Sequence, residues 1–273
     1  MAPMKTCISQ CTLMNTPMPE DLAAIVDVGW QAVELWLTKV EQYLQTHTTE
    51  QLQGLWQQHQ VKPVAASYQG GLLISQGEQR QAMFDQFRQR LDLCQLIGVP
   101  LMVLAPDVAP QLDEISLQRM LVSLTQAAQW ASGYGIELAV EFRTGTCCTN
   151  LETAIELVEQ CQQENLGICL DLYHFIKGPS KTEDLDRLTP HNLKHVQLCD
   201  SPWLLREMMV DSERVMPGDG NLPIASIVSK LQAIGYAGHC SLELMNPTIW
   251  AMKPTQVAEL GKMAMDRILE SKQ

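Results

Sequence analysis

Residues 167–174 read Gly-Ile-Cys-Leu-Asp-Leu-Tyr-His, an apolar run that stops at the carboxylate of Asp171 and is followed three residues later by the imidazole of His174. Short apolar runs of this kind are typical of strands buried on both faces of a parallel sheet. Three other apolar runs also stop at an acid, at Glu141, Asp200 and Glu243. The pattern predicts buried strands whose ends converge on one reactive site.

A repeating unit surrounds these runs. A helical pattern, a glycine and then a short apolar run recur around Gly29, Gly98 and Gly235. Glycine after the last helical turn supplies a left-handed cap, and the apolar run beyond it begins the next strand. The repeat predicts alternating helices and strands, and therefore a parallel sheet.

The number of these units selects the architecture. We expect eight strands, at Cys7–Leu13, Ala32–Leu37, Val61–Ser67, Leu101–Ala105, Ile136–Phe142, Leu166–Asp171, His195–Cys199 and Cys240–Leu244. Helical patterns lie at Glu20–Val28, Thr49–His59, Glu78–Ile97, Ser116–Tyr134, Leu151–Gln163, Thr182–Leu188, Ile224–Ile234 and Pro254–Glu270. Eight such units in about 250 residues match a closed (β/α)8 TIM barrel, an α/β fold.

A doubly wound sheet is the alternative architecture. Its glycine-rich phosphate fingerprint would follow the first strand, where Cys11-Thr12-Leu13-Met14-Asn15 stands instead. The sequence has no interior linker, low-complexity tract or block of like charges. We therefore expect one barrel domain over residues 1–273.

Composition restricts the class of protein. The chain is 46% hydrophobic, and no apolar run reaches the roughly 18 residues of a membrane span. The first residues show no secretory pattern, and nine scattered cysteines fit buried thiols in a reducing compartment, so we expect a cytoplasmic protein that does not bind membranes. A net charge of −12 disfavours binding to nucleic acid.

Strand alternation indicates which residues face the barrel interior. Glu141, Asp171, Gln197 and Glu243 share a face with small or polar neighbours, whereas the opposite faces of their strands are apolar. All four are expected near the carboxyl ends of their strands, where barrel enzymes place their chemistry. We therefore expect these four side chains to point inward together.

Three carboxylates in one barrel mouth would repel one another unless a cation or protons intervened, so we expect one divalent metal ion. Oxygen ligands favour Mn²⁺ or Mg²⁺, and Co²⁺ or Zn²⁺ would suit the site if His174 or His195 joined it. His195 lies lower on its strand, and a hydrogen-bonded interior histidine is the better interpretation for it.

Such a site suits chemistry next to a carbonyl group. The metal would acidify the proton between a carbonyl and its neighbouring hydroxyl, one carboxylate would remove that proton, and another group would return it. This is isomerase or epimerase chemistry. If a hydroxyl lies β to the carbonyl, the same enolate can expel it as water, and the enzyme would be a dehydratase.

Basic side chains near the predicted strand ends are candidate substrate contacts. Arg214 precedes Pro217-Gly218-Asp219-Gly220, where it could reach a substrate oxygen or stand in a plain surface turn. His174 is a candidate site residue, with a solvated loop position as the alternative. Arg143 and Lys177 either contact substrate or offset local negative charge. Cys147 and Cys148 have no evident base partner, and we interpret them as structural.

These motifs together resemble the xylose isomerase-like barrel superfamily, the sugar phosphate isomerase/epimerase group, over essentially the whole chain. The matching motifs are Ala-Val-Glu141-Phe, Leu-Asp171-Leu-Tyr-His174, His-Val-Gln197-Leu, Arg214 before Pro-Gly-Asp-Gly, and Ser-Leu-Glu243-Leu. The resemblance implies that Glu141, Asp171, Gln197 and Glu243 bind one divalent metal and that the two glutamates act as an acid/base pair. Many relatives carry histidine in place of Gln197. Glutamine is more similar to the hydroxypyruvate isomerase, inosose dehydratase and dehydroshikimate dehydratase branches.

Three functions remain open from the sequence. The leading hypothesis is a metal-dependent isomerase or epimerase that acts on a small polyhydroxylated carbonyl compound through an enediolate, with Glu141, Glu243 and His174 as catalytic residues. The second is a dehydratase of an inosose or a dehydroshikimate-like ketone. The third is a catalytically silent barrel that binds a sugar or a partner protein. Exposed Trp or Met residues in loops such as 202–216 would also suit a homodimer contact.

Overall fold

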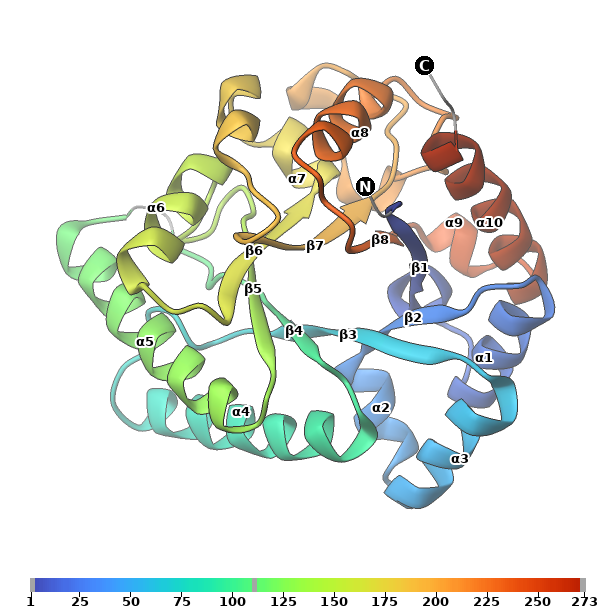
Figure 1. Cartoon of the computed structure of the whole chain (residues 1–273), viewed down its shortest axis with the longest axis horizontal. Helices are drawn as coiled ribbons and strands as arrows, with labels where there is room; N and C mark the ends of the chain where they lie inside the picture. Colours follow the sequence, from blue (N-terminus) through green and yellow to red (C-terminus); the bar gives the residue numbers. More distant parts are fainter. Residues whose placement is uncertain (1–2, 110–111, 271–273) are drawn as a thin grey trace. The chain divides into compact units, whose positions relative to one another are not determined.

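The eight strands follow one another in a closed barrel, in the order of the sequence (Figure 1). The computed structural model describes residues 3–109 and 112–270. Its strands are β1 (Lys5–Ser9), β2 (Ala32–Trp36), β3 (Lys62–Gln69), β4 (Leu101–Leu104), β5 (Glu137–Glu141), β6 (Leu166–Asp171), β7 (Leu193–Leu198) and β8 (His239–Leu242). The predicted (β/α)8 barrel is confirmed.

Helices connect the strands. They are α1 (Met18–Asp27), α2 (Leu37–Tyr43), α3 (Thr49–His59), α4 (Gly77–Ile97), α5 (Glu114–Gly133), α6 (Leu151–Cys161), α7 (Leu172–Lys177), α8 (Ile224–Ala233), α9 (Pro247–Trp250) and α10 (Pro254–Glu270). Short 3-10 turns lie at η1 (Gln10–Leu13), η2 (Thr182–Arg187), η3 (Arg206–Met208) and η4 (Asp211–Glu213). None of the described helices is long and apolar enough to cross a membrane.

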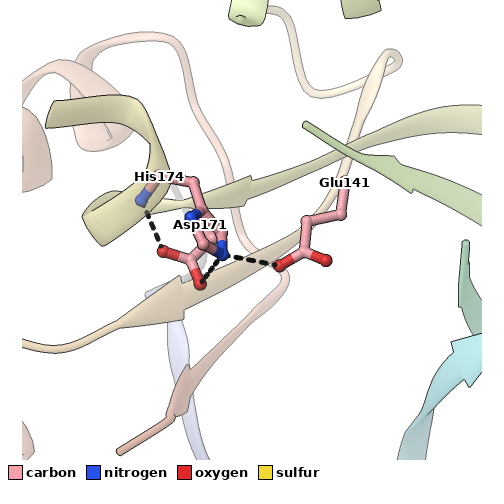
Figure 2. Close-up of side chains that lie close together, drawn as sticks. All are labelled: Glu141, Asp171 and His174. Carbon is pink, nitrogen blue, oxygen red and sulfur yellow. Dashed lines mark hydrogen bonds and ion pairs between the residues drawn. The ribbon is translucent and has the colours of Figure 1, made fainter. Parts of the chain in front are cut away.

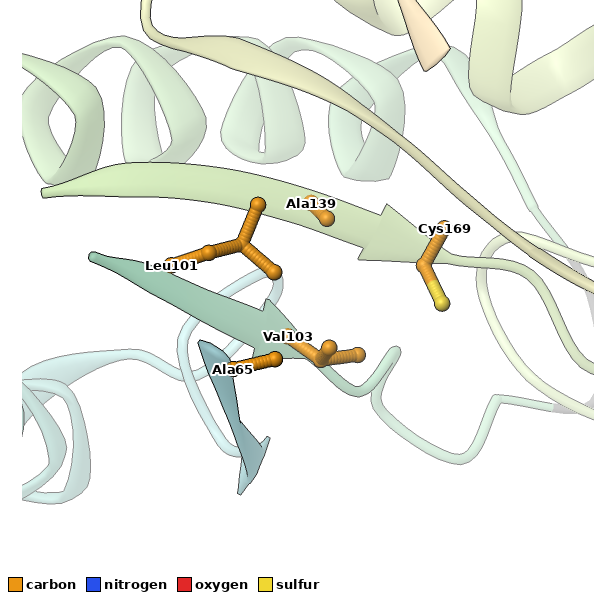
Figure 3. Packing of buried hydrophobic residues seen from close by; sticks show 5 residues of the cluster. All are labelled: Ala65, Leu101, Val103, Ala139 and Cys169. Atoms are coloured by element: carbon orange, nitrogen blue, oxygen red, sulfur yellow. The ribbon is translucent and has the colours of Figure 1, made fainter. Parts of the chain in front are cut away.

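The chain divides into two compact units, one of residues 1–64 with 196–273 and one of residues 65–195. In the second unit, a layer of apolar side chains packs along β3 to β6, formed by Ala65, Leu101, Val103, Ala139 and Cys169 (Figure 3). Glu141 and Asp171 each come two residues after a member of this layer. They therefore project from the same face, one step nearer the carboxyl ends of their strands.

The unit of residues 1–64 and 196–273 repeats this arrangement. Cys7, Ala32 and Val64 form a small buried cluster. Ser9 and Glu34 follow Cys7 and Ala32 by two residues, and both are fully buried. In this unit β1 pairs with β2 and β8, and β7 pairs with β8, all in parallel. In both units, buried polar side chains thus lie on the same strand face as the apolar cluster, one step nearer the carboxyl ends of the strands.

Several predicted boundaries are wrong. The first strand ends at Ser9 instead of Leu13, because the Ser9 hydroxyl accepts a hydrogen bond from the backbone N–H of Cys11 and begins the turn η1. The segment expected as a helix after Thr182 is the 3-10 turn η2. Helices α2, α7 and α9 were not predicted, because each is only four to seven residues long and too short to show a helical period.

Candidate metal centre

Two acids and a histidine meet in the unit of residues 65–195. Glu141 is the last residue of β5, Asp171 is the last residue of β6, and His174 lies in α7, which begins directly after β6. Both carboxylates are fully buried and His174 is 3% exposed. Each residue offers one ligand atom within 4.8 Å of the others, so the group could hold a metal ion.

The side chains of this group point toward one another from two strand ends and a helix start (Figure 2). The Nε2 atom of His174 lies 3.7 Å from Oε1 of Glu141 and 3.9 Å from Oδ2 of Asp171. Two ligands about 2.1 Å from one ion are about 3.0–3.4 Å apart at octahedral or tetrahedral angles. The two distances from the imidazole would thus need to shorten by about 0.3–0.9 Å for all three side chains to share one divalent ion, and the donor types suit such an ion.

Arg143, two residues after Glu141 at the end of β5, places a positive charge beside the Glu141 carboxylate. The Nη2 atom of Arg143 lies 3.5 and 3.4 Å from the two carboxylate oxygens of Glu141. The guanidinium of Arg143 stands 5.7 Å from the centre of the Tyr68 ring. Arg143 therefore offsets the charge of Glu141, as one of its two interpretations predicts. Lys177 is the last residue of α7 and is half-buried, and its predicted substrate contact stays a prediction.

A second buried polar group lies in the unit of residues 1–64 and 196–273, and it contains Glu34, Gln197 and Glu243. Their exposed fractions are 0%, 1% and 0%. The Gln197 side-chain amide donates to Oε1 of Glu34 at 2.9 Å and to Oε1 of Glu243 at 3.1 Å. Gln197 and Glu243, two of the predicted metal ligands, are thus neighbours, as are Glu141 and Asp171 in the other group.

Arg214 joins this second group as an ion-pair partner. Its Nη1 atom lies 3.4 Å from Oε2 of Glu243, and its Nε atom donates to Asp211 at 2.6 Å. The backbone carbonyl of Arg214 accepts a hydrogen bond from Asn246 at 2.8 Å. Because Arg214 is 1% exposed, the alternative of a plain surface turn is wrong for this residue.

The turn after Arg214 is organised by Asp200, the acid that ends the run after His195. The Asp200 carboxylate accepts hydrogen bonds from the backbone N–H groups of Gly218, Gly220 and Leu222 at 2.9–3.0 Å. A Cβ at Gly220 would clash with the carboxylate of Asp200. Asp200 therefore holds the loop and differs in role from the other three acids.

Glu34 was not among the site residues predicted from the sequence. A signal was present, because Glu34 is the single charged residue in the apolar run from Ala32 to Leu37 and shares a face with Ala32.

His195 is 2% exposed, which agrees with an interior position. Trp203 and Met208, from the loop proposed for a homodimer contact, are 41% and 43% exposed, and that contact stays a prediction.

The adjacent cysteines after β5 are buried, and their pKa values are raised. Burial, with a smaller contribution from the charge of Asp107, raises the pKa of Cys147 to about 12. Burial also raises the pKa of Cys148 far above that of an ordinary thiol, and the charges of Cys147 and Glu141 act in the same direction. Both side chains are buried thiols, as the structural interpretation predicts.

Comparisons with known proteins find relatives over most of the chain. The inosose isomerase of Halalkalibacterium halodurans is 26% identical over 269 residues, which are 95% of this chain and 94% of that protein. The 3-dehydroshikimate dehydratase of Pseudomonas aeruginosa is 26% identical over 256 residues, 89% of this chain but 38% of that protein.

A crystal structure of the IOLI protein with a binding zinc atom has the same fold, with a TM-score of 0.93, 23% identity and 98% of each chain covered. A sequence model of the xylose isomerase-like TIM barrel family matches residues 22–266. A match over this much of the chain, with acids at the strand ends, shows that the protein belongs to the xylose isomerase-like TIM barrel family.

Proposed function

We propose that the protein is a divalent-metal-dependent isomerase of a small polyhydroxylated ketone of the inosose type. The buried group of Glu141, Asp171 and His174 carries the proposal, because its candidate ligand atoms lie within 4.8 Å of one another. The two carboxylates would bind a divalent ion, and the imidazole would face a substrate bound to that ion. The relatives named inosose isomerase support the reaction and the substrate class.

The proposed ligands are Glu141, Asp171, Gln197 and Glu243. Their carboxylate and amide oxygens suit Mn²⁺ or Mg²⁺, and the zinc atom of the IOLI protein adds Zn²⁺ to the ions to be tested. A bound divalent ion would polarise the carbonyl and the adjacent hydroxyl of a substrate. A divalent ion would also offset the negative charges of the three buried carboxylates, beyond what Arg143 and Arg214 supply.

The proposed reaction moves one proton between neighbouring carbons. One of the two glutamates, Glu141 or Glu243, removes the proton from the carbon that bears a hydroxyl next to the carbonyl. The electron pair of that C–H bond forms the C=C bond of an enediolate. The other glutamate donates a proton to the former carbonyl carbon while the hydroxyl proton passes between the two oxygens, so no atom is gained or lost.

Two further side chains would hold the substrate. His174 and Arg214 would donate hydrogen bonds to its hydroxyl or carbonyl oxygens. Arg214 is already fixed between Asp211 and Glu243, so its guanidinium is preorganised and loses little freedom when the substrate binds. The imidazole Nε2 of His174 lies 3.7 Å from Glu141 and 3.9 Å from Asp171, which restricts this side chain in a similar way.

A dehydratase is the second candidate function, because relatives that are 26% and 24% identical to this chain are named 3-dehydroshikimate dehydratase. The same enediolate would expel a β-hydroxyl as water. Product analysis separates the two functions, since dehydration creates a conjugated enone or an aromatic ring that absorbs ultraviolet light. The appearance of such absorption with dehydroshikimate, but no isomerisation of an inosose, would replace the proposed reaction.

The direct test is solvent exchange. Protein loaded with Mn²⁺ is incubated with an inosose in D₂O, and deuterium on the carbons next to the carbonyl is followed by NMR. Exchange and isomerisation should fall about 10²–10⁴-fold in Glu141→Gln, the usual contribution of a general base. Glu137→Gln is the matched control, because Glu137 is on the same strand, exposed and paired with Lys194.

Two results would contradict the proposal. Equal exchange and isomerisation in wild type and Glu141→Gln would exclude Glu141 from both of its proposed roles, metal ligand and member of the acid/base pair. No exchange and no ultraviolet change with any inosose or dehydroshikimate, in metal-loaded wild-type protein, would favour the catalytically silent barrel.

A further inference from the structure

Glu34 is a buried acid to which neither the resemblance nor the proposed reaction gives a role. It lies in the middle of β2, two residues after Ala32 on the same face, and is fully buried. A buried carboxylate is costly unless it is hydrogen bonded or paired with a cation. Glu34 accepts a 2.9 Å hydrogen bond from the side-chain amide of Gln197.

The amide nitrogen of Gln197 lies between two carboxylates. It donates to Oε1 of Glu34 and to Oε1 of Glu243, so both hydrogens of the NH₂ group are used. If the amide were turned over, its oxygen would lie about as close to the same two carboxylate oxygens, with no proton between them. The two glutamates therefore fix which end of the amide is the oxygen, and the planar group directs that oxygen away from both.

This orientation matters because an amide binds a cation through its oxygen only. Glu243 is itself a proposed metal ligand, so a bound cation would compete with Gln197 for its oxygens. Glu34 is the acceptor that has no proposed part in metal binding. Ligands of metal ions are commonly oriented by such an outer partner, which is usually conserved in its chemistry because its loss weakens binding.

We propose that Glu34 is a positioning residue, which holds the Gln197 side chain with its oxygen turned toward the metal. The inference rests on the proposed metal function. It explains how a glutamine, whose amide could otherwise present either end, can serve as a ligand in this barrel.

Three substitutions separate position from charge. Glu34→Asp keeps the negative charge but is one methylene shorter and cannot reach Gln197 from the same backbone. Glu34→Gln loses the charge but keeps an oxygen at the same reach. Glu34→Leu loses both. The affinity for Mn²⁺ alone is measured by titration calorimetry on protein stripped with chelator, and chemical unfolding of each stripped variant shows whether it is folded.

If Glu34 acts by position, Glu34→Asp and Glu34→Leu should bind Mn²⁺ about 10–100-fold more weakly, the usual effect of removing an outer partner. Glu34→Gln should stay nearer to wild type than either. The reverse order, with Glu34→Asp equal to wild type and Glu34→Gln as weak as Glu34→Leu, would mean that Glu34 only adds negative charge. That order would overturn the inference. If Glu34→Leu does not fold, the Mn²⁺ affinities of Glu34→Asp and Glu34→Gln are sufficient to distinguish the two explanations.

The Glu34 substitution is also made in protein that carries Gln197→Ala, to show whether Glu34 acts through Gln197. In Gln197→Ala protein, the oxygen that Glu34 orients is absent, so adding Glu34→Leu should weaken Mn²⁺ binding little further. A full additional loss in the double variant would overturn the inference. Wild-type protein that binds no Mn²⁺ would overturn both this inference and the proposed function. Wild-type binding with unchanged affinity in all Glu34 variants would overturn the inference alone.

Discussion

Asp171 and His174 are joined twice, through different atoms. Oδ1 of Asp171 accepts a 3.0 Å hydrogen bond from the backbone N–H of His174, and Oδ2 lies 3.9 Å from the imidazole Nε2 of the same residue. The first contact is a helix N-cap, which begins α7 at the end of β6. The Asp171 carboxylate therefore caps the helix that contains His174, and it also lies next to the imidazole of that residue.

Because Asp171 makes both contacts, substitutions at this position can distinguish its effect on metal affinity from its effect on stability. Asparagine caps a helix about as well as aspartate, so Asp171→Asn should keep the cap and lose the charge. We expect it to lose metal affinity while the metal-free protein stays within ~1 kcal/mol of wild type in urea unfolding. Asp171→Ala should lose the metal and a further ~1 kcal/mol from the missing cap. Equal stability of the two variants would contradict the capping role.

Arg214 stabilises the loop before α8 through two acids of different burial. Arg214→Gln leaves Glu243 buried without this partner, and we expect it to lower the free energy of unfolding by about 3–5 kcal/mol. Asp211 is 41% exposed, so Asp211→Asn should cost at most ~1 kcal/mol. Denaturant unfolding of both variants provides the test. If the two substitutions lower the free energy of unfolding equally, burial of the Arg214–Glu243 pair does not determine its contribution to stability.

A buried pair outside the proposed site gives a pH prediction. Burial raises the pKa of Asp21 to about 7, although Lys39, 2.7 Å away, opposes the shift. Between about pH 4 and pH 7 the folded protein then holds a proton that the unfolded chain has released. This contribution to stability is therefore greatest at low pH and is lost as the pH rises through 7.

The pH dependence can be assigned with one variant. The contribution of Asp21 is at most ~4 kcal/mol for a shift of about three pKa units. Asp21→Asn cannot titrate, so the free energy of unfolding of wild type should fall relative to that of Asp21→Asn between pH 4 and pH 7. Parallel curves for the two proteins would exclude Asp21 as the source of the pH dependence.

The cysteines give a prediction about reactivity. All nine are buried and none is in a disulfide, and burial raises the pKa of several of them, Cys147 and Cys240 each to about 12. Thiolates are the reactive form, so the folded protein should react slowly with a thiol reagent at pH 8 and show nine thiols only in denaturant. One fast-reacting thiol in the folded protein would contradict this burial.

The fold was predictable because its signals are local and repeated. Helices ended by Gly98 or Gly235 and apolar runs such as 166–171 specify each unit without knowledge of the rest. Boundaries that depend on distant groups were not predictable. The end of β1 is set by the Ser9 side chain and by Thr12, whose hydroxyl donates to the carbonyl of Leu242, 230 residues away.

The candidate site was predictable in its members more than in its contacts. Strand alternation identified Glu141, Asp171, Gln197 and Glu243, because a period of two holds whatever the strands pack against. The pairing of Glu34 with Gln197 joins residues 163 positions apart, and no local pattern encodes it. Burial of Arg214 likewise depends on Glu243, which the sequence places 29 residues later.

The metal content of the purified protein tests the central claim most directly. Elemental analysis of wild type beside Asp171→Ala and Glu243→Gln should find about one divalent ion per chain in wild type and much less in both variants. If no preparation contains a divalent ion, and wild type does not bind added Mn²⁺, the proposed centre and its chemistry are wrong.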